Sequence, residues 1–283
     1  MAGKLDGIQT PTTYHLPPAR RRPIQRQELQ DTFTPSAPVE RFPTRSEMQA
    51  VMRGFNEDQE RAVLGGSNRP GRLVPLVRGH NGAVMTIHGA NAAPETVNSL
   101  AEPGLRRGQE VHTFAYDDRF RSLQNSSQDL ARELGEWMER NPGQPLTLRA
   151  HSMGGRVTLG ALALLQEQGR LQGRRLNLDL VAPPLGGYSE ANLARLDPTG
   201  VAGSLFPMVR PGVDMGTTSE FQRRLENLRL PENVRTRIFL GGRDEVVNPN
   251  LSGFRRIQQN LGAEVIRLPE ADHESILQQV VGH

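Results

Sequence analysis

Residues 146–155 constrain the fold of this chain more than any other stretch. Residues 146–150 alternate apolar and polar side chains as a β-strand does, and the sequence His-Ser-Met-Gly-Gly follows directly. Apolar helix formers then continue to about Gln168. This order predicts a strand, a sharp turn that carries Ser152, and a buried helix. A serine on such a turn projects its hydroxyl beyond the sheet, because small neighbours let the strand and the helix pack closely around it.

Strand-like and helix-like segments alternate from about Arg72 to the C-terminus. This alternation predicts an α/β fold, with a mostly parallel sheet covered by helices on both faces. The first two strands are expected to form an antiparallel edge. Ser126 is expected to cap a helix that ends at Asn141-Pro142-Gly143. The expected strands are residues 73–77, 83–87, 110–116, 146–150, 176–182, 237–240 and 264–268.

The first part of the chain has a different composition. Residues 1–43 are rich in proline and include Arg20-Arg21-Arg22, which predicts a flexible N-terminal arm. The remaining residues, 44–283, are expected to form one α/β domain. Its connection at about 184–234 is much longer than an ordinary connection in α/β proteins, which predicts a cap inserted into the domain.

Composition excludes several classes of function. The chain has no cysteine, which rules out disulfides, thiolate metal sites and a cysteine nucleophile. Its 34 basic and 31 acidic residues are too balanced to indicate a nucleic-acid partner. The histidines have no spacing typical of a metal site, so we expect neither a metal nor an organic cofactor. Without a visible signal peptide or membrane-spanning segment, a cytoplasmic protein is the default expectation, and non-classical export is left open.

Three residues with complementary chemistry each follow a predicted strand. Ser152 follows residues 146–150, Asp244 follows 237–240, and His273 follows 264–268. Since the carboxyl ends of parallel strands meet at one edge of a sheet, these side chains should lie together. His273 would take the proton of Ser152 as it attacks an acyl carbonyl, and Asp244 would orient the imidazole. Asp179, inside an apolar run, is the alternative acid.

A loop after the second predicted strand completes the candidate site. The sequence His88-Gly89-Ala90-Asn91 places a glycine where the backbone must approach the reacting oxygen. The backbone N–H groups of Ala90 and Met153 are expected to form an oxyanion hole. His88, Gly89, His151 and Gly154 are expected to support this arrangement.

Four motifs in this order resemble those of a known superfamily. The sequences AHSMGG, IHGAN, GGRDEVV and ADHESI are similar to those of α/β-hydrolase serine esterases and lipases, with Ala150 in place of the usual first glycine of G-x-S-x-G. The resemblance covers residue 73 to the C-terminus, is strongest to bacterial lipase-like members and is weaker to inositol-deacylase-like ones. It implies an α/β-hydrolase fold and hydrolysis of a carboxylic ester through an acyl-enzyme on Ser152.

The substrate is less well determined than the chemistry. The apolar run at 201–209 would suit an acyl chain, or would simply pack on the core. We expect a small-molecule or lipid ester, with transient contact with a lipid surface and an oligomeric state left open. A thioester, a lactone or a phospholipid acyl group are alternative substrates for the same residues. An inactive hydrolase fold that serves as a binding module is the alternative from a different class.

Overall fold

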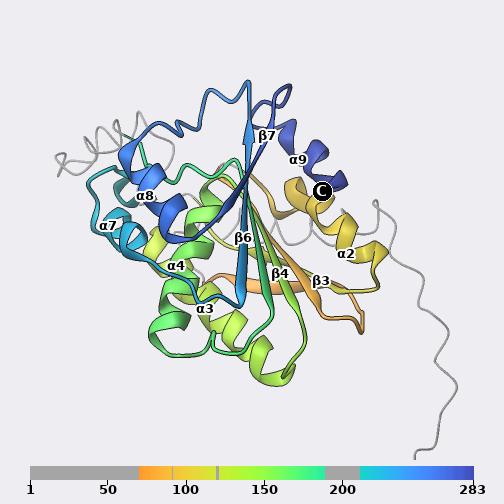
Figure 1. Ribbon diagram of the computed structural model, residues 1–283. Coiled ribbons are helices and arrows are strands. Elements are labelled where there is room, and N and C mark those ends of the chain that lie inside the picture. The colour runs from red at the N-terminus through yellow and green to blue at the C-terminus, as the bar shows by residue number, and fades with distance from the viewer. Residues whose placement is uncertain (1–69, 91, 119–120, 189–210) are drawn as a thin grey trace, which may run out of the picture. The chain divides into compact units, whose positions relative to one another are not determined.

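The structure, a computed structural model, describes residues 70–90, 92–118, 121–188 and 211–283. These residues form a seven-stranded sheet in the order β1-β3-β2-β4-β5-β6-β7 (Figure 1). All neighbouring strands are parallel except β1 and β3, which are antiparallel. The strands are β1 Arg72–Val77, β2 Ala83–Ile87, β3 Glu110–Ala115, β4 Leu146–His151, β5 Leu176–Val181, β6 Val234–Gly241 and β7 Glu264–Leu268.

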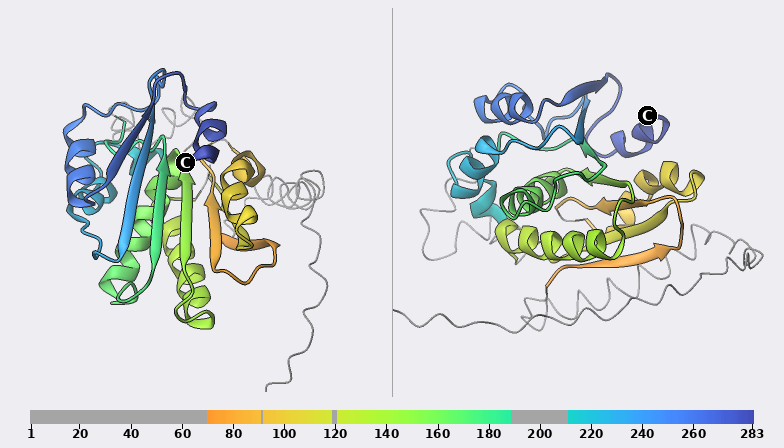
Figure 2. Two further views of the ribbon diagram at one scale, coloured as in Figure 1. Left: turned by 45° about the vertical axis from the view of Figure 1, so that its right-hand side comes forward. Right: turned by 60° about the horizontal axis from the view of Figure 1, so that its bottom comes forward.

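Helices cover both faces of this sheet (Figure 2). The helical elements are η1 Pro94–Ala101, α2 Glu102–Arg106, α3 Leu123–Arg140, α4 Met153–Glu167, α6 Pro211–Met215, α7 Glu220–Asn227, α8 Ser252–Asn260, α9 Ile276–Gln279 and η3 Val280–Gly282. The elements α3, α4, α7 and α8 lie along one face, and η1, α2 and α9 lie along the other. The α/β fold predicted from the sequence, a mostly parallel sheet with helices on both faces, is therefore confirmed.

The burial of the strands follows their places in the sheet. All five residues of β2 and all six of β4 are buried, as expected of central parallel strands that are covered on both sides. The edge strands β1 and β7 consist of exposed and partly buried residues instead, except that the last residue of each, Val77 and Leu268, is buried. The helix α4 packs against α3 and α7, which explains why its apolar residues extend around most of its circumference.

Arg156 in α4 is a buried charge that ties two parts of the chain together. Its guanidinium donates to the carbonyl of Pro184 (3.1 Å), the carbonyl of Asp214 (2.9 Å) and Oε1 of Gln222 (2.6 Å). Burial lowers its pKa to about 10, so the side chain stays protonated at neutral pH. The chain on either side of residues 189–210 is therefore held on α4 by one side chain.

Two local expectations are wrong. The strand β1 pairs with β3, not with the second strand, because β2 enters the sheet between β3 and β4. The α3 helix begins one turn earlier than expected, since Ser122 is its N-cap and its Oγ accepts from the N–H of Asn125 (3.1 Å). Ser126 is buried within that helix. A serine at 122 or at 126 could cap the helix as far as the sequence pattern goes. The helix that begins after Ser122 places Leu123 in the core, which favours Ser122 as the cap.

Two expectations fall on residues that the structure does not describe. They are the arm at 1–43 and the apolar run at 201–209. The division into arm, domain and cap therefore stays a prediction. Within the expected cap, α7 packs against α4 and α8 and buries Phe221 and Leu225 in the main core. Among the described helices, none is long and apolar enough to span a membrane.

Candidate active site

Ser152 lies on a strained turn between β4 and α4. Its backbone has φ 51° and ψ −126°, a left-handed conformation that is rare for a residue with a side chain. The strain is held in place because β4 is buried in the sheet and α4 in the helix layer, so neither end of the turn can relax. The serine side chain is placed beyond the carboxyl end of β4, as the sequence predicts.

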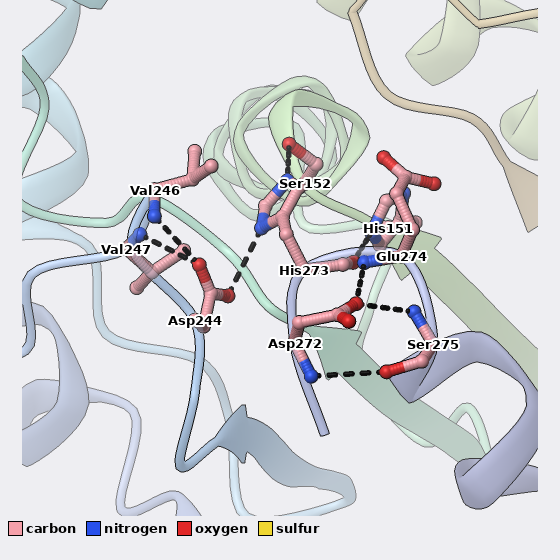
Figure 3. Close-up of polar contacts among 9 residues, drawn as sticks. All are labelled: His151, Ser152, Asp244, Val246, Val247, Asp272, His273, Glu274 and Ser275. Carbon is pink, nitrogen blue, oxygen red and sulfur yellow. Dashed lines mark hydrogen bonds and ion pairs between the residues drawn. The ribbon is translucent and has the colours of Figure 1, made fainter. Parts of the chain in front are cut away.

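A chain of hydrogen bonds connects Ser152 with the two other candidate residues (Figure 3). Nε2 of His273 lies 2.9 Å from Oγ of Ser152, and Nδ1 of His273 lies 2.9 Å from Oδ2 of Asp244. A carboxylate can only accept, so Nδ1 carries the proton and Nε2 is free to accept one from the serine hydroxyl. The three side chains thus have the arrangement that proton transfer from Ser152 requires.

The second carboxylate oxygen of Asp244 is occupied by the backbone. Oδ1 accepts from the N–H groups of Val246 (2.8 Å) and Val247 (3.0 Å). Burial is the largest single influence on the pKa of Asp244, and it raises that pKa. The hydrogen bond and charge of His273, together with the two backbone N–H groups, lower the pKa by more, so the net shift is downward. The carboxyl group is therefore ionised at neutral pH and fixed in orientation.

The loop that carries His273 is anchored at two points. Asp272 accepts from the N–H groups of Glu274 (3.0 Å) and Ser275 (2.8 Å), and Oγ of Ser275 accepts from the N–H of Asp272 (3.0 Å). Behind the loop, Nε2–H of His151 donates to the carbonyl of His273 (2.9 Å) (Figure 3). The residue before the nucleophile therefore holds the backbone of the candidate base.

His151 is kept neutral by its surroundings. Its residue surface is 3% exposed, and this burial is the largest cause that lowers its pKa to about 4. The hydrogen bond to the carbonyl of His273 raises the pKa of His151. The ring of His273, whose centroid lies 5.0 Å from that of His151, lowers it further. A neutral imidazole in this place donates one hydrogen bond without adding positive charge beside His273.

Glycines allow the loop after β2 to approach the serine turn. A Cβ on Gly89 would lie 2.9 Å from Cβ of Ser152, and one on Gly154 would overlap the carbonyl oxygens of Ile87 and His88. Only glycine permits these contacts, which bring the backbone of residues 88–90 against the first turn of α4. Met153 is the first residue of α4, so its N–H has no partner within the helix.

The same loop is stiffened by His88 and Tyr116. The sequence predicted a supporting role for His88 and none for Tyr116. Nδ1–H of His88 donates to the carbonyl of Gly89 (2.9 Å), and the hydroxyl of Tyr116 donates to the carbonyl of His88 (2.8 Å). The two rings stack with centroids 4.4 Å apart. Burial, the main cause, lowers the pKa of His88, so its imidazole is neutral. A tyrosine at the end of β3 gives no sequence signal of this contact.

Asp179, the alternative acid, is engaged elsewhere. It is completely buried in β5, where its carboxylate pairs with Arg149 of β4 (2.9 Å) and with Arg237 of β6 (2.8 Å). These three residues are direct neighbours in the sheet register. The structure thus brings His273 to Asp244 and not to Asp179.

One group of side chains in the described residues has ligand atoms close enough for a metal ion. The atoms of His151, His273 and Glu274 lie within 4.8 Å of one another. Both ring nitrogens of His273 already contact Ser152 and Asp244, and Nε2 of His151 contacts the carbonyl of His273. A metal here would displace these hydrogen bonds, so the arrangement favours proton transfer over metal binding.

Comparisons with known proteins place the fold of this chain among known ones. A family model described as lecithin:cholesterol acyltransferase matches residues 86–187, about a third of the chain. A structure from work on the metagenome-derived lipolytic enzymes LipS and LipT is 17% identical, with a TM-score of 0.55, and covers 75% of this chain and 94% of its own. The mature lipase BlEst2 of Bacillus licheniformis is 17% identical, with a TM-score of 0.55 and coverages of 74% and 94%.

A putative thioesterase from a Silicibacter species is 14% identical, with a TM-score of 0.53, and covers 90% of this chain and 95% of its own. No curated protein sequence matches the chain. At these identities the structures show a shared fold. The chain has the α/β-hydrolase fold. Within that fold, its structural neighbours include lipases, esterases and thioesterases.

Proposed function

We propose that this protein is a serine hydrolase that cleaves carboxylic esters through an acyl-enzyme on Ser152. The observation that carries the proposal is the hydrogen-bond chain from Oγ of Ser152 through His273 to Asp244, with both contacts at 2.9 Å. A merely structural serine would need no imidazole held at its hydroxyl, nor a carboxylate behind that imidazole.

The roles of the three residues follow from their contacts. Nε2 of His273 takes the proton of Ser152 while Oγ attacks the acyl carbonyl, and the same nitrogen then protonates the departing alcohol. Asp244 holds the tautomer with Nδ1 protonated and stabilises the imidazolium that forms. A water molecule then repeats the sequence with the acyl-enzyme, which releases the carboxylic acid and restores Ser152.

Charge on the carbonyl oxygen would be stabilised by backbone donors. We assign this role to the N–H groups of Met153 and Ala90, the first at the start of α4 and the second in the loop held by His88. Because the contacts of Gly89 and Gly154 fix this loop against α4, the two donors would be in place before substrate binds. Such preorganised donors each contribute about 10²-fold or more to the rate.

Lipid esters are the substrate class that the comparisons favour. The matched family model, lecithin:cholesterol acyltransferase, spans the loop of His88 and the turn of Ser152, and lipases are among the structural neighbours. We therefore propose a lipid or small-molecule ester, whose acyl group is transferred to Ser152.

The test combines labelling with turnover. A fluorophosphonate probe should label wild-type protein and not Ser152→Ala, and p-nitrophenyl esters from acetyl to palmitoyl should be hydrolysed only by the wild type. The preferred chain length separates an esterase from a lipase, and matched oxygen esters and thioesters separate either from a thioesterase. Absence of both labelling and turnover, with Ser152→Ala and wild type equally folded, would refute the proposal in favour of a binding module.

A further inference from the structure

A cavity lies away from the candidate active site, between α8 and the edge of the sheet. Its volume is about 510 Å³, within the range of small-molecule sites in proteins. Helix α8 covers the end of the sheet that β6 and β7 form (Figures 1 and 2). None of the residues that line this cavity is a contact of Ser152 or His273 in the described part of the chain.

The inner wall of the cavity is apolar. Leu240 from β6, Phe254 from α8 and Val265 from β7 line it together. Leu240 and Phe254 are 3% and 1% exposed, so they belong to the core and form a fixed surface. Val265 is only partly buried because β7 is the last strand of the sheet. Of the three, Val265 therefore offers most of the apolar surface that an aliphatic chain could reach, with Leu240 and Phe254 as the fixed support behind it.

Two arginines line the same cavity on its solvent side. Arg255 comes from α8 and Arg267 from β7, and both are exposed. Among the described residues, neither guanidinium forms an ion pair, although other arginines in this region do. Arg256 pairs with Glu226 (2.8 Å), and Arg235 lies 3.9 Å from Glu264. Glu226 and Glu264 thus face other arginines, and none of the described acidic side chains lines the cavity, which leaves it with two positive charges beside an apolar wall.

From this combination we infer that the cavity binds an amphiphile with a single aliphatic chain and an anionic head, such as a fatty-acid anion. The chain would lie against Leu240, Phe254 and Val265, and the carboxylate would pair with Arg255 and Arg267. Guanidinium groups bind carboxylates with charge-assisted hydrogen bonds, which are the stronger class. A cationic amphiphile would meet like charges, and a neutral one would leave both arginines without a partner.

The experiment is a calorimetric titration of the full chain with sodium laurate below its micelle concentration. Three proteins are compared: wild type, the double variant Arg255→Gln/Arg267→Gln, and the control Arg107→Gln/Arg229→Gln. The control removes two exposed arginines elsewhere on the described surface, so net charge changes equally. The cavity variant should weaken laurate binding about tenfold, whereas the control should stay close to wild type.

A second variant tests the cavity itself without a change of charge. Gln258, which also lines it and is half-buried, becomes tryptophan in Gln258→Trp and should occupy the space of the chain. This variant should also lose laurate binding, while fluorophosphonate labelling of Ser152 stays as in wild type.

Four outcomes would overturn the inference. Equal laurate affinity in all proteins would place any bound carboxylate elsewhere, including beside Ser152. If wild type bound dodecyltrimethylammonium as tightly as laurate, the cavity would not select an anionic head group. The third is binding to anionic phospholipid vesicles without binding of monomeric laurate, which would indicate a membrane surface. The fourth is a complete lack of binding by wild type.

Discussion

Replacing His151 by glutamine should remove part of the acid sensitivity of the fold. The wild-type imidazole is buried, and its pKa is lowered from 6.5 to about 4 because burial disfavours its charged form. Glutamine places an amide N–H close to where Nε2–H of histidine lies, so it can keep the hydrogen bond to the carbonyl of His273 while it carries no titratable proton.

The direction of the effect follows from which state binds the proton first. As pH falls below 6.5, the unfolded chain protonates His151 and the folded protein does not, so folding stability is lost. The contribution is fully present above pH 6.5 and decreases as pH falls toward 4. With the folded pKa at about 4, the loss relative to neutral pH is about 2 kcal/mol at pH 5 and about 3 kcal/mol at pH 4.

The assay is chemical denaturation at pH 7.5, 5 and 4, followed by tryptophan fluorescence. Trp137 is the single tryptophan and is 3% exposed, so its emission reports the loss of the core. Burial also lowers the pKa of His88 and His112, so wild type should lose more stability than His151 alone explains. The difference between wild type and His151→Gln isolates the share of His151, and His80→Gln, at an exposed position, serves as the control.

The reasoning fails if wild type and His151→Gln lose the same free energy of unfolding between pH 7.5 and 4, within about 0.5 kcal/mol. The role of His151 in positioning is tested with His151→Leu, which removes the donor to the His273 carbonyl. At pH 7.5 the leucine variant should lose turnover with little change in KM, and the glutamine variant should retain most of it. Equal activity of the two variants would refute the positioning role.

Three further substitutions separate chemistry from structure. Asp244→Asn should lower kcat/KM by about 10³–10⁴-fold with an intact fold, because the amide cannot stabilise the imidazolium; steady-state kinetics beside a circular dichroism spectrum checks this. Asp179→Asn should instead destabilise the fold by about 3–5 kcal/mol, since Arg149 and Arg237 would lose the carboxylate they share; denaturant titration measures it. Gly154→Ala should push the loop of His88 away from α4 and reduce kcat by about 10²-fold; an unchanged kcat would show that the loop geometry is not critical.

The sheet and the position of the candidate site could be predicted because both depend on local patterns. The strand before Ser152 alternates apolar and polar residues, the helix after it is mostly apolar, and the turn between them consists of small residues. Since parallel strands end at a common edge, the placement of Ser152, Asp244 and His273 after three such strands was enough to bring them together.

Contacts between distant segments could not be predicted in the same way. The pairing of β1 with β3 depends on which strand reaches the edge of the sheet, and nothing local to residues 72–77 encodes that choice. Arginine in a helix ordinarily indicates a solvated face, yet Arg156 is completely buried because carbonyl groups from Pro184 and Asp214 surround it. The hydrogen bond from His151 to the His273 carbonyl likewise joins residues that are 122 positions apart.

Asp179 and Asp244 show why the position of a carboxylate relative to the end of its strand decides what it can do. Asp179 is inside β5, so its side chain stands on one face of the sheet, beside the arginines at the same register of β4 and β6. Both of its oxygens are taken by these arginines. Asp244 lies three residues after β6 ends at Gly241, where the backbone turns and its own N–H groups at Val246 and Val247 hold one oxygen. The other oxygen then faces the loop that follows β7, and that geometry gives His273 its partner.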